Sequence, residues 1–308
     1  MNKKLCGDLT LLLTALIWGT AFVAQSAGMD YVGPFTYNGV RTLLGGLVLL
    51  PLIPLFDRRK PAMEPAKRRE LDKLSALGGL CCGLLLCVAS SFQQYGISMT
   101  TAGKAGFITA LYIVIVPLMG VFIHKKIPGS TWLCVAIAVA GFYLLCVKEG
   151  LSVSTGDLLV LCGAFFFSLH IMVIDHFNAK AVDGVRMSCV QFLVSGAITM
   201  IPALLFEEIH FLSLWAARYS ILYAGVMSCG VAYTLQILGQ RHTEPTTATL
   251  ILSLESVFAV LSGWLILHES LSGREILGCC LVFVAVLLAQ LPLPQLLQTL
   301  FCRRKKEA

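Results

Sequence analysis

Residues 246–267 read TTATLILSLESVFAVLSGWLIL, and this stretch decides the fold. Its 22 residues are apolar except for small hydroxyl side chains and one carboxylate, Glu255. An α-helix of this length spans a hydrocarbon core of about 30 Å, because each residue adds about 1.5 Å. Glu255 would lie roughly 14 Å into that helix, near the middle of the bilayer. An ionised group there costs at least about 2.5–3.5 kcal/mol on insertion scales, so Glu255 marks a candidate functional site that needs polar partners.

The rest of the chain has the composition of a protein that crosses a membrane many times. Of its 308 residues, 57% are hydrophobic and 13% are charged, whereas soluble domains carry about 25% charged residues. Short turn-like connections separate the apolar runs, so the sequence predicts an all-α membrane protein with ten transmembrane helices. Their expected ranges are 8–27, 34–56, 75–97, 103–124, 130–147, 156–176, 185–206, 217–240, 246–267 and 274–293.

Two features of the sequence suggest other classes of protein, and both are rejected. The twelve cysteines show no Cys-x-x-Cys or zinc-finger spacing, and most lie in apolar runs, where cysteine behaves as a small hydrophobe. We therefore expect no metal site and no cofactor. The N-terminus resembles a signal peptide, with Lys3 and Lys4 before an apolar run and Ala24-Gln25-Ser26 as a passable cleavage site. That run is long for a signal peptide and its pattern recurs in mid-chain, so we interpret it as the first helix.

The basic residues predict the orientation of the chain. With the N-terminus in the cytoplasm, 18 of the 23 Lys and Arg residues fall in cytoplasmic segments and four fall outside, while Arg41 lies within a helix. This asymmetry is typical of the positive-inside rule, so we expect both termini in the cytoplasm. The net charge of +6 could suggest a nucleic-acid partner. The basic tail Arg303–Lys306 is better interpreted as a topology anchor, and no nucleic-acid binding is expected.

The two halves of the sequence resemble each other. Residues 102–120 align without a gap on residues 245–263, which places Tyr112 opposite Glu255. Shorter echoes link Gly7-Asp8 with Gly156-Asp157, and Val40-Arg41 and Gly46 with Val190-Gln191 and Gly196.

This repeat has a topological consequence. Each half holds five helices, an odd number, so the second copy must enter the membrane in the opposite orientation. We expect one repeat over residues 1–148 and a second over 149–308, the latter with the basic cytoplasmic tail. Inverted repeats with a solute site near the bilayer midplane are a signature of secondary transporters, in which the two halves rock around the site.

The chain resembles the drug/metabolite transporter superfamily, in particular its ten-helix EamA branch. The matching segments, which span the whole chain, are Ala15–Thr20, Arg41, Ala102–Ala105, Thr109–Tyr112, Pro117, Leu254–Ala259 and His268-Glu269. The family usually has proline directly after the tyrosine and the glutamate of these segments. Ile113 and Ser256 stand there instead, so helix kinking is expected to differ locally.

The resemblance implies a ten-helix bundle with a central cavity lined mainly by helices 1, 3, 4, 6, 8 and 9. It further implies export or exchange of amino acids, related metabolites or amphipathic compounds, often driven by protons. A bacterial inner (plasma) membrane location is expected on the same basis.

Glu255 and Arg41 are the candidate coupling or ion-pair residues. A carboxyl group in an apolar environment favours its neutral form, so Glu255 could take up and release a proton in each transport cycle. The alternative is a structural carboxyl group. Arg41, about 10 Å from the outer end of its helix, must pair or reach water. Its guanidinium could bind a substrate carboxylate or serve as counter-charge to Glu255, and the alternative is snorkelling or a structural ion pair.

Trp18 and Tyr112 are candidate aromatic walls of the cavity. Aromatic faces suit ammonium groups and aromatic substrates. The alternative is helix packing or an aromatic belt at the membrane interface, and Tyr112 is too deep for the belt.

Five further side chains are candidates to contact a polar substrate. Gln93, Gln94 and Gln236 are buried amides that offer donors and an acceptor. Tyr233 lies three residues before Gln236, so the two share a helical face. His170, in the middle of helix 6, could titrate near neutral pH. The alternative for each is a hydrogen bond that bridges two helices. With Trp18, Tyr112 and Glu255, these five make up the predicted substrate-binding set.

The sequence therefore predicts a secondary active transporter that exports amino acids or related small metabolites or amphipathic compounds. Its expected partners are the small-molecule substrate, the lipid bilayer and protons. One alternative is an importer, because alternating access is reversible. Another is a membrane-embedded enzyme, but the chain has no His-x-x-x-His, Gly-x-Ser-x-Gly or paired-Asp motif, so we expect no enzyme.

Overall fold

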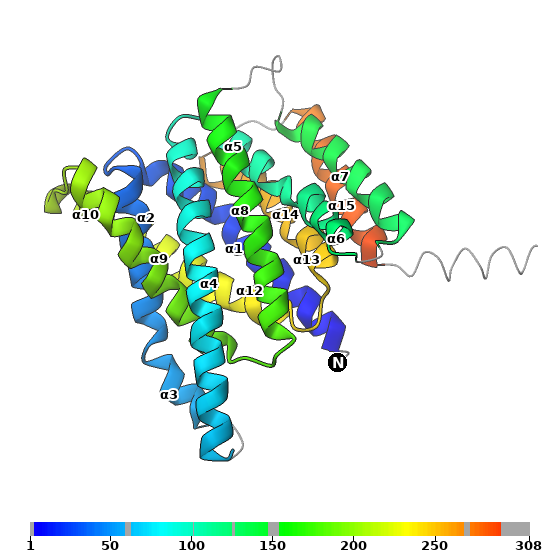
Figure 1. Ribbon diagram of the computed structural model, residues 1–308. Coiled ribbons are helices and arrows are strands. Elements are labelled where there is room, and N and C mark those ends of the chain that lie inside the picture. Colours follow the sequence, from blue (N-terminus) through cyan, green and yellow to red (C-terminus); the bar gives the residue numbers. More distant parts are fainter. Residues whose placement is uncertain are drawn as a thin grey trace, which may run out of the picture.

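A computed structural model describes residues 3–58, 63–100, 102–124, 127–146, 154–267 and 272–290, and the regular structure in these ranges is helical (Figure 1). The elements are α1 (Lys3–Gly28), α2 (Pro34–Leu49), α3 (Leu52–Asp57), α4 (Pro65–Ile97), α5 (Ala102–Ala110), α6 (Tyr112–Phe122), α7 (Gly129–Cys146), α8 (Thr155–Asn178), α9 (Gly184–Phe206), α10 (Phe211–Ala216), α11 (Arg218–Leu222), the π-helix η1 (Tyr223–Tyr233), α12 (Thr234–Gly239), α13 (Pro245–Leu252), α14 (Leu254–Leu267) and α15 (Gly273–Gln290). The segments His268-Glu269 and Arg303–Lys306, singled out in the sequence, lie outside the described residues.

The prediction of an all-α membrane protein is confirmed. Within the described ranges, eight helical stretches are long and apolar enough to cross a membrane, and two shorter apolar helices lie within α7 and α15. Large apolar side chains such as Leu84, Leu118 and Leu204 are exposed on the bundle, as expected for a surface that faces lipid.

One helix boundary differs clearly from the prediction. The third membrane segment, α4, begins at Pro65 and not near residue 75, and its first turns project beyond the neighbouring helices in Figure 1. These turns are rich in Lys, Arg and Glu, which are good helix formers, and Pro65 stands in the first turn, where proline is favoured. A hydropathy pattern finds the apolar part of such a helix and misses its polar extension.

Two matching hydrogen bonds connect the halves of the chain. The hydroxyl of Thr243, just before α13, donates to Asp8 Oδ1 of α1 over 2.8 Å. The hydroxyl of Thr100, just before α5, donates to Asp157 Oδ1 of α8, also over 2.8 Å. The alignment that places Tyr112 opposite Glu255 also places Thr100 opposite Thr243. Each half therefore donates one of these bonds to the other half and accepts the other bond from it. This reciprocity is the relationship expected of an inverted repeat.

Glycine contacts repeat in the same way. A Cβ atom on Gly7 would lie 2.9 Å from the carbonyl oxygen of Gly239, and one on Gly156 would lie 3.0 Å from that of Gly96. These distances are at or below the closest that real Cβ atoms show, so glycine allows α1 to pack on α12 and α8 on α4. The sequence echo between Gly7-Asp8 and Gly156-Asp157 thus corresponds to two equivalent helix crossings.

Acidic side chains tie the second membrane segment, which comprises α2 and α3, to α9 at both ends. At one end, the Glu207 carboxylate accepts hydrogen bonds from the backbone N–H groups of Phe35 (2.9 Å) and Thr36 (2.7 Å), in the first turn of α2. At the other, Asp57 at the end of α3 forms an ion pair with Arg186, in the first turn of α9. A carboxylate at a helix N-terminus satisfies otherwise unpaired N–H groups and interacts well with the helix dipole.

The fourth and ninth membrane segments are each interrupted at their centre. Leu111 separates α5 from α6, and Ser253 separates α13 from α14. Neither interruption requires a proline directly after Tyr112 or Glu255. In both segments the interruption lies one or two residues before the polar side chain. Tyr112 thus begins α6, and Glu255 is the second residue of α14.

Candidate functional site

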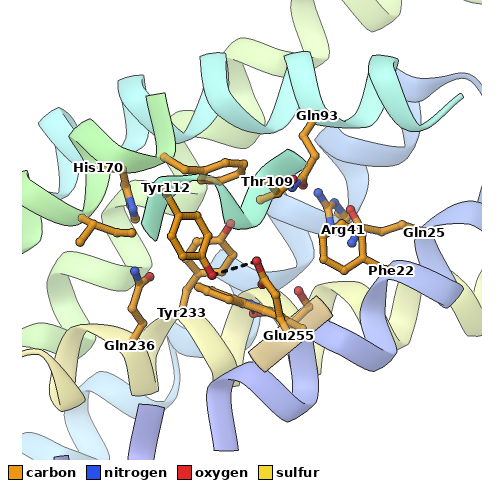
Figure 2. A pocket seen from close by; sticks show the side chains of 14 residues that line it. Phe22, Gln25, Arg41, Gln93, Thr109, Tyr112, His170, Tyr233, Gln236 and Glu255 are labelled. Carbon is orange, nitrogen blue, oxygen red and sulfur yellow. Dashed lines mark hydrogen bonds between the residues drawn. The ribbon is translucent and has the colours of Figure 1, made fainter. Parts of the chain in front are cut away.

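A buried cavity lies inside the bundle, at the level of the two interrupted helices (Figure 2). Its lining is drawn from both halves of the chain and consists of Trp18, Phe22, Gln25, Arg41, Gln93, Thr109, Tyr112, Phe167, His170, Ile171, Ser228, Tyr233, Gln236 and Glu255. The six helices expected to line a central cavity all contribute, and α2 adds Arg41. The volume is about 40 Å³. A water needs at least about 10–15 Å³ of such space, so there is room for about three waters.

Tyr112 and Glu255 meet in this cavity. The Tyr112 hydroxyl donates to Glu255 Oε1 over 3.0 Å, and the Glu255 side chain is only 3% exposed (Figure 2). Glu255 forms no ion pair with any basic residue in the described ranges. It lies in the first turn of α14, where the backbone N–H groups favour negative charge. The site therefore holds a buried carboxyl group with a neutral donor and no compensating cation.

Arg41 reaches the same cavity but does not pair with Glu255. Its Nε and Nη2 atoms donate to Asn38 Oδ1 over 3.2 and 3.1 Å, and its guanidinium carbon lies 5.7 Å from the centroid of the Tyr37 ring. The side chain is 5% exposed. The ion pair with Glu255 that the sequence allowed is not formed, because the guanidinium is turned toward the amide three residues earlier on its own helix. Figure 2 shows Arg41 beside Gln25, away from His170 and Gln236.

An aromatic group forms one wall. The rings of Trp18 and Tyr233 have centroids 4.6 Å apart. The rings of His170 and Phe192 make edge contacts with Tyr233, at centroid distances of 5.9 and 5.5 Å. Trp18 Nε1 donates to the backbone carbonyl of Ser228 over 3.4 Å. That carbonyl belongs to η1, and π-helical turns are frequent at functional sites.

The polar residues of the cavity differ in how well they are satisfied. Gln93 Nε2 donates to Thr109 Oγ1 over 3.0 Å, and His170 Nε2 donates to Gln191 Oε1 over 3.0 Å. In contrast, Gln25 Oε1 and Gln236 Oε1 are buried without a hydrogen-bond partner among the described residues. Two acceptor atoms are therefore available to donors on a bound molecule.

The structure brings eight of the nine candidate residues to the cavity and leaves out Gln94. Gln94 is fully buried, and its Nε2 donates to Met29 Sδ over 3.1 Å. Gln93 and Gln94 are adjacent in α4, so their side chains point about 100° apart and only one faces the cavity. In this structure Gln94 connects α4 to the turn that follows α1.

Several lining residues were not selected from the sequence. Phe22 and Gln25 follow Trp18 by four and seven positions, and Phe167 and Ile171 flank His170 on the same face of α8. The helical period could have found these four. Thr109 precedes Tyr112 by three positions and carries the same signal, whereas Ser228 has none. Among the described residues, no group of three or more His, Cys, Asp or Glu side chains could hold a metal ion.

Comparison with known proteins gives a family match. The model of the EamA-like transporter family matches twice, over residues 5–147 and 154–291. A solved protein crystal structure that is 18% identical in sequence has the same fold, with a TM-score of 0.73 over 94% of this chain and 98% of its own.

Three relatives are similar over nearly their whole length. An "Uncharacterized transporter" of Archaeoglobus fulgidus is 30% identical and covers 94% of this chain and 87% of its own. The "Uncharacterized transporter YoaV" of Bacillus subtilis is 23% identical, with coverages of 90% and 95%. The "Uncharacterized inner membrane transporter YedA" of Escherichia coli is 24% identical, with coverages of 90% and 88%.

Proposed function

The chain belongs to the EamA-like transporter family, and from this premise we propose that it is a secondary active transporter that exports a small organic solute, in the class of amino acids and related metabolites or amphipathic compounds. The two repeats, residues 1–148 and 149–308, rock about the cavity and open it to one side of the membrane at a time. One observation carries this proposal: a cavity with polar side chains from both halves in its lining lies where two helices are interrupted.

Glu255 is the proposed coupling residue. A carboxylate that is buried without a cation is costly, so the group favours proton uptake before it is enclosed and proton release when water reaches it. Its hydrogen bond from Tyr112 joins a helix of the first half to a helix of the second. A change in the charge of Glu255 therefore acts on the contact between the two moving halves.

The proposed orientation places both termini in the cytoplasm of a bacterial inner membrane. The order of the helices places three segments at the same end of the bundle: the N-terminal end of α1, the start of α4 and the α8–α9 connection. Described basic residues gather there: Lys3, Lys4, Arg58, Lys67, Arg68, Arg69, Lys73, Lys180, Arg186 and Arg241. Such an excess is typical of the cytoplasmic side.

Transport in proteoliposomes tests the proposal. The purified protein is reconstituted and offered amino acids, small organic acids and amphipathic cations, with and without a pH gradient. We expect at least one solute to accumulate with the gradient and to be recovered chemically unchanged. In Glu255→Gln, exchange should persist while gradient-driven accumulation is lost, and Arg69→Gln, an exposed change far from the cavity, should behave as wild type.

The outcomes separate the parts of the proposal. Transport of no solute would contradict the transporter. Accumulation that ignores the gradient and is unchanged in Glu255→Gln would contradict coupling alone. Everted vesicles distinguish export from import, because an exporter concentrates its solute inside them when the gradient is present.

A further inference from the structure

Arg41 is a buried cation without an anion. Its side chain lies at the cavity, is 5% exposed and pairs with no carboxylate in the described ranges. Its partners are the neutral amide of Asn38 and the face of Tyr37. Buried charges in proteins are normally paired, and those inside a membrane mark binding sites or pathways. A group that satisfies this cation is therefore expected to come from outside the chain.

A short hydrogen-bond relay fixes how the guanidinium is presented. The Ser90 hydroxyl donates to the Leu86 carbonyl over 2.6 Å, so its oxygen is left to accept from Asn38 Nδ2 over 2.9 Å. This sets the orientation of the amide, with Asn38 Oδ1 toward Arg41. Asn38 then occupies the Nε and Nη2 edge of the guanidinium, and Nη1 forms no hydrogen bond with any residue that the structure describes.

An unpaired acceptor lies beside this cation. Gln25 Nε2 donates to the Ala21 carbonyl over 3.3 Å, and this bond identifies the other amide atom as Oε1. Gln25 is 4% exposed, and its Oε1 has no partner among the described residues. Figure 2 shows Gln25 and Arg41 together at one end of the cavity. A buried acceptor without a donor costs about 1–3 kcal/mol, so this atom also calls for a donor from a bound molecule.

The second half of the chain does not repeat this arrangement. In the alignment of the halves, Arg41 corresponds to Gln191, which accepts from His170 and carries no charge. The position equivalent to Arg41 is therefore uncharged, so only one of the two related positions offers a cation, and a solute with a negative end would bind in a single orientation.

We propose that Arg41 binds the carboxylate of the transported solute, that Asn38 positions the guanidinium for this contact, and that Gln25 Oε1 accepts from an N–H or O–H group next to that carboxylate. The solute class is a small organic acid with a donor beside its carboxylate, such as an α-amino or α-hydroxy acid. This inference rests on the proposed function, since it gives the cavity its solute.

Binding to the purified protein in detergent tests the inference without transport. The readout is the shift in thermal unfolding temperature, titrated with matched probes that differ in their charged groups. The aromatic set is phenylalanine, 3-phenylpropionate and phenethylamine, and the aliphatic set is leucine, 4-methylpentanoate and 3-methylbutylamine. We expect the amino acid of at least one set to bind most tightly, its acid analogue to bind more weakly, and its amine analogue to be weakest.

Asn38→Asp is the decisive variant. It keeps the size of the side chain and places a carboxylate against Arg41, so the cation is neutralised from within and the Ser90 hydroxyl can turn to donate to it. We expect carboxylate probes to bind about tenfold or more weakly, as for loss of a charged hydrogen bond, while amine affinity changes little. Arg41→Gln should likewise weaken the binding of carboxylate probes and leave the binding of amines little changed. Arg41→Lys should keep part of the carboxylate affinity. The exposed Arg69→Gln should match wild type.

A purely structural role for Arg41 predicts the opposite result. Asn38→Asp would then raise the unfolding temperature and leave the ranking of probes unchanged, which would overturn the inference. Absence of carboxylate-dependent stabilisation in both sets would overturn it too. If carboxylate binding is found and lost as described, while proteoliposomes show no transport, the anion site stands and the proposed function fails.

Discussion

Tyr112 and Glu255 occupy equivalent positions in the two halves of the chain, and the hydroxyl of one donates to the carboxyl oxygen of the other over 3.0 Å. Related positions in an inverted repeat approach each other only near the axis that relates the halves. The bond therefore marks where the halves meet, and it lies on the wall of the cavity.

Replacement of Tyr112 by Phe should weaken the contact between the halves. The change removes the donor to Glu255 and keeps the ring, so the lost hydrogen bond to an acidic group should lower the free energy of unfolding by about 1–3 kcal/mol. Thermal unfolding in detergent measures the loss. Tyr143→Phe is the matched control and should leave stability unchanged, because Tyr143 is exposed and does not line the cavity. Equal stability of Tyr112→Phe and the control would show that the bond contributes nothing.

The inverted repeat predicts that two equivalent positions face opposite sides of the membrane. Met99 and His242 are separated by the same interval as Tyr112 and Glu255, and both are exposed in the connections before α5 and α13. In a cysteine-depleted background, Met99→Cys should react with an impermeant maleimide in intact cells. His242→Cys should react only in everted vesicles. Labelling of both variants from the same side would contradict the repeat.

Gly19 should be indispensable for the position of Glu255. A Cβ atom there would lie 2.4 Å from Phe258 Cβ and 2.7 Å from the Glu255 carbonyl oxygen, so Gly19→Ala must push α14 away from α1. We expect a loss of about 1–3 kcal/mol of stability, as for other overpacked sites, and reduced transport. Gly129, whose added Cβ would meet nothing within 4 Å, provides the control, and Gly129→Ala should be silent in both assays.

The two Thr–Asp bonds should contribute equally. Thr243→Val and Thr100→Val each remove one 2.8 Å hydrogen bond and keep the shape of the side chain. Each should cost about 1 kcal/mol, and the double variant should cost the sum because the bonds lie at separate crossings. Thermal unfolding of the three variants measures this. A strongly unequal pair of effects would mean that the two halves are not energetically equivalent.

Much of the fold follows from sequence patterns, since the length of an apolar run fixes where a helix can span the membrane. Those patterns did not reveal the polar start of α4, because its Lys, Arg and Glu residues give no hydropathy signal. The interruptions at Leu111 and Ser253 were also missed, because neither position carries a residue that breaks helices by itself.

The candidate site could be predicted as a set of polar residues at mid-depth but not as a set of contacts. Depth follows from position in a helix, which selected Glu255 and Arg41. The hydrogen-bond partner of a side chain depends on rotation about the helix axis and on side-chain conformation. The sequence therefore does not predict that Arg41 bonds to Asn38 and not to Glu255. Adjacent residues face different ways, and this separated Gln93 from Gln94.

The small volume of the cavity limits how far water inside it can reach across the membrane. A file of hydrogen-bonded waters across a 30 Å core needs about ten molecules at about 2.8 Å spacing. A cavity of about 40 Å³ holds about three of them. Waters confined to this cavity would therefore span less than about a third of the membrane core.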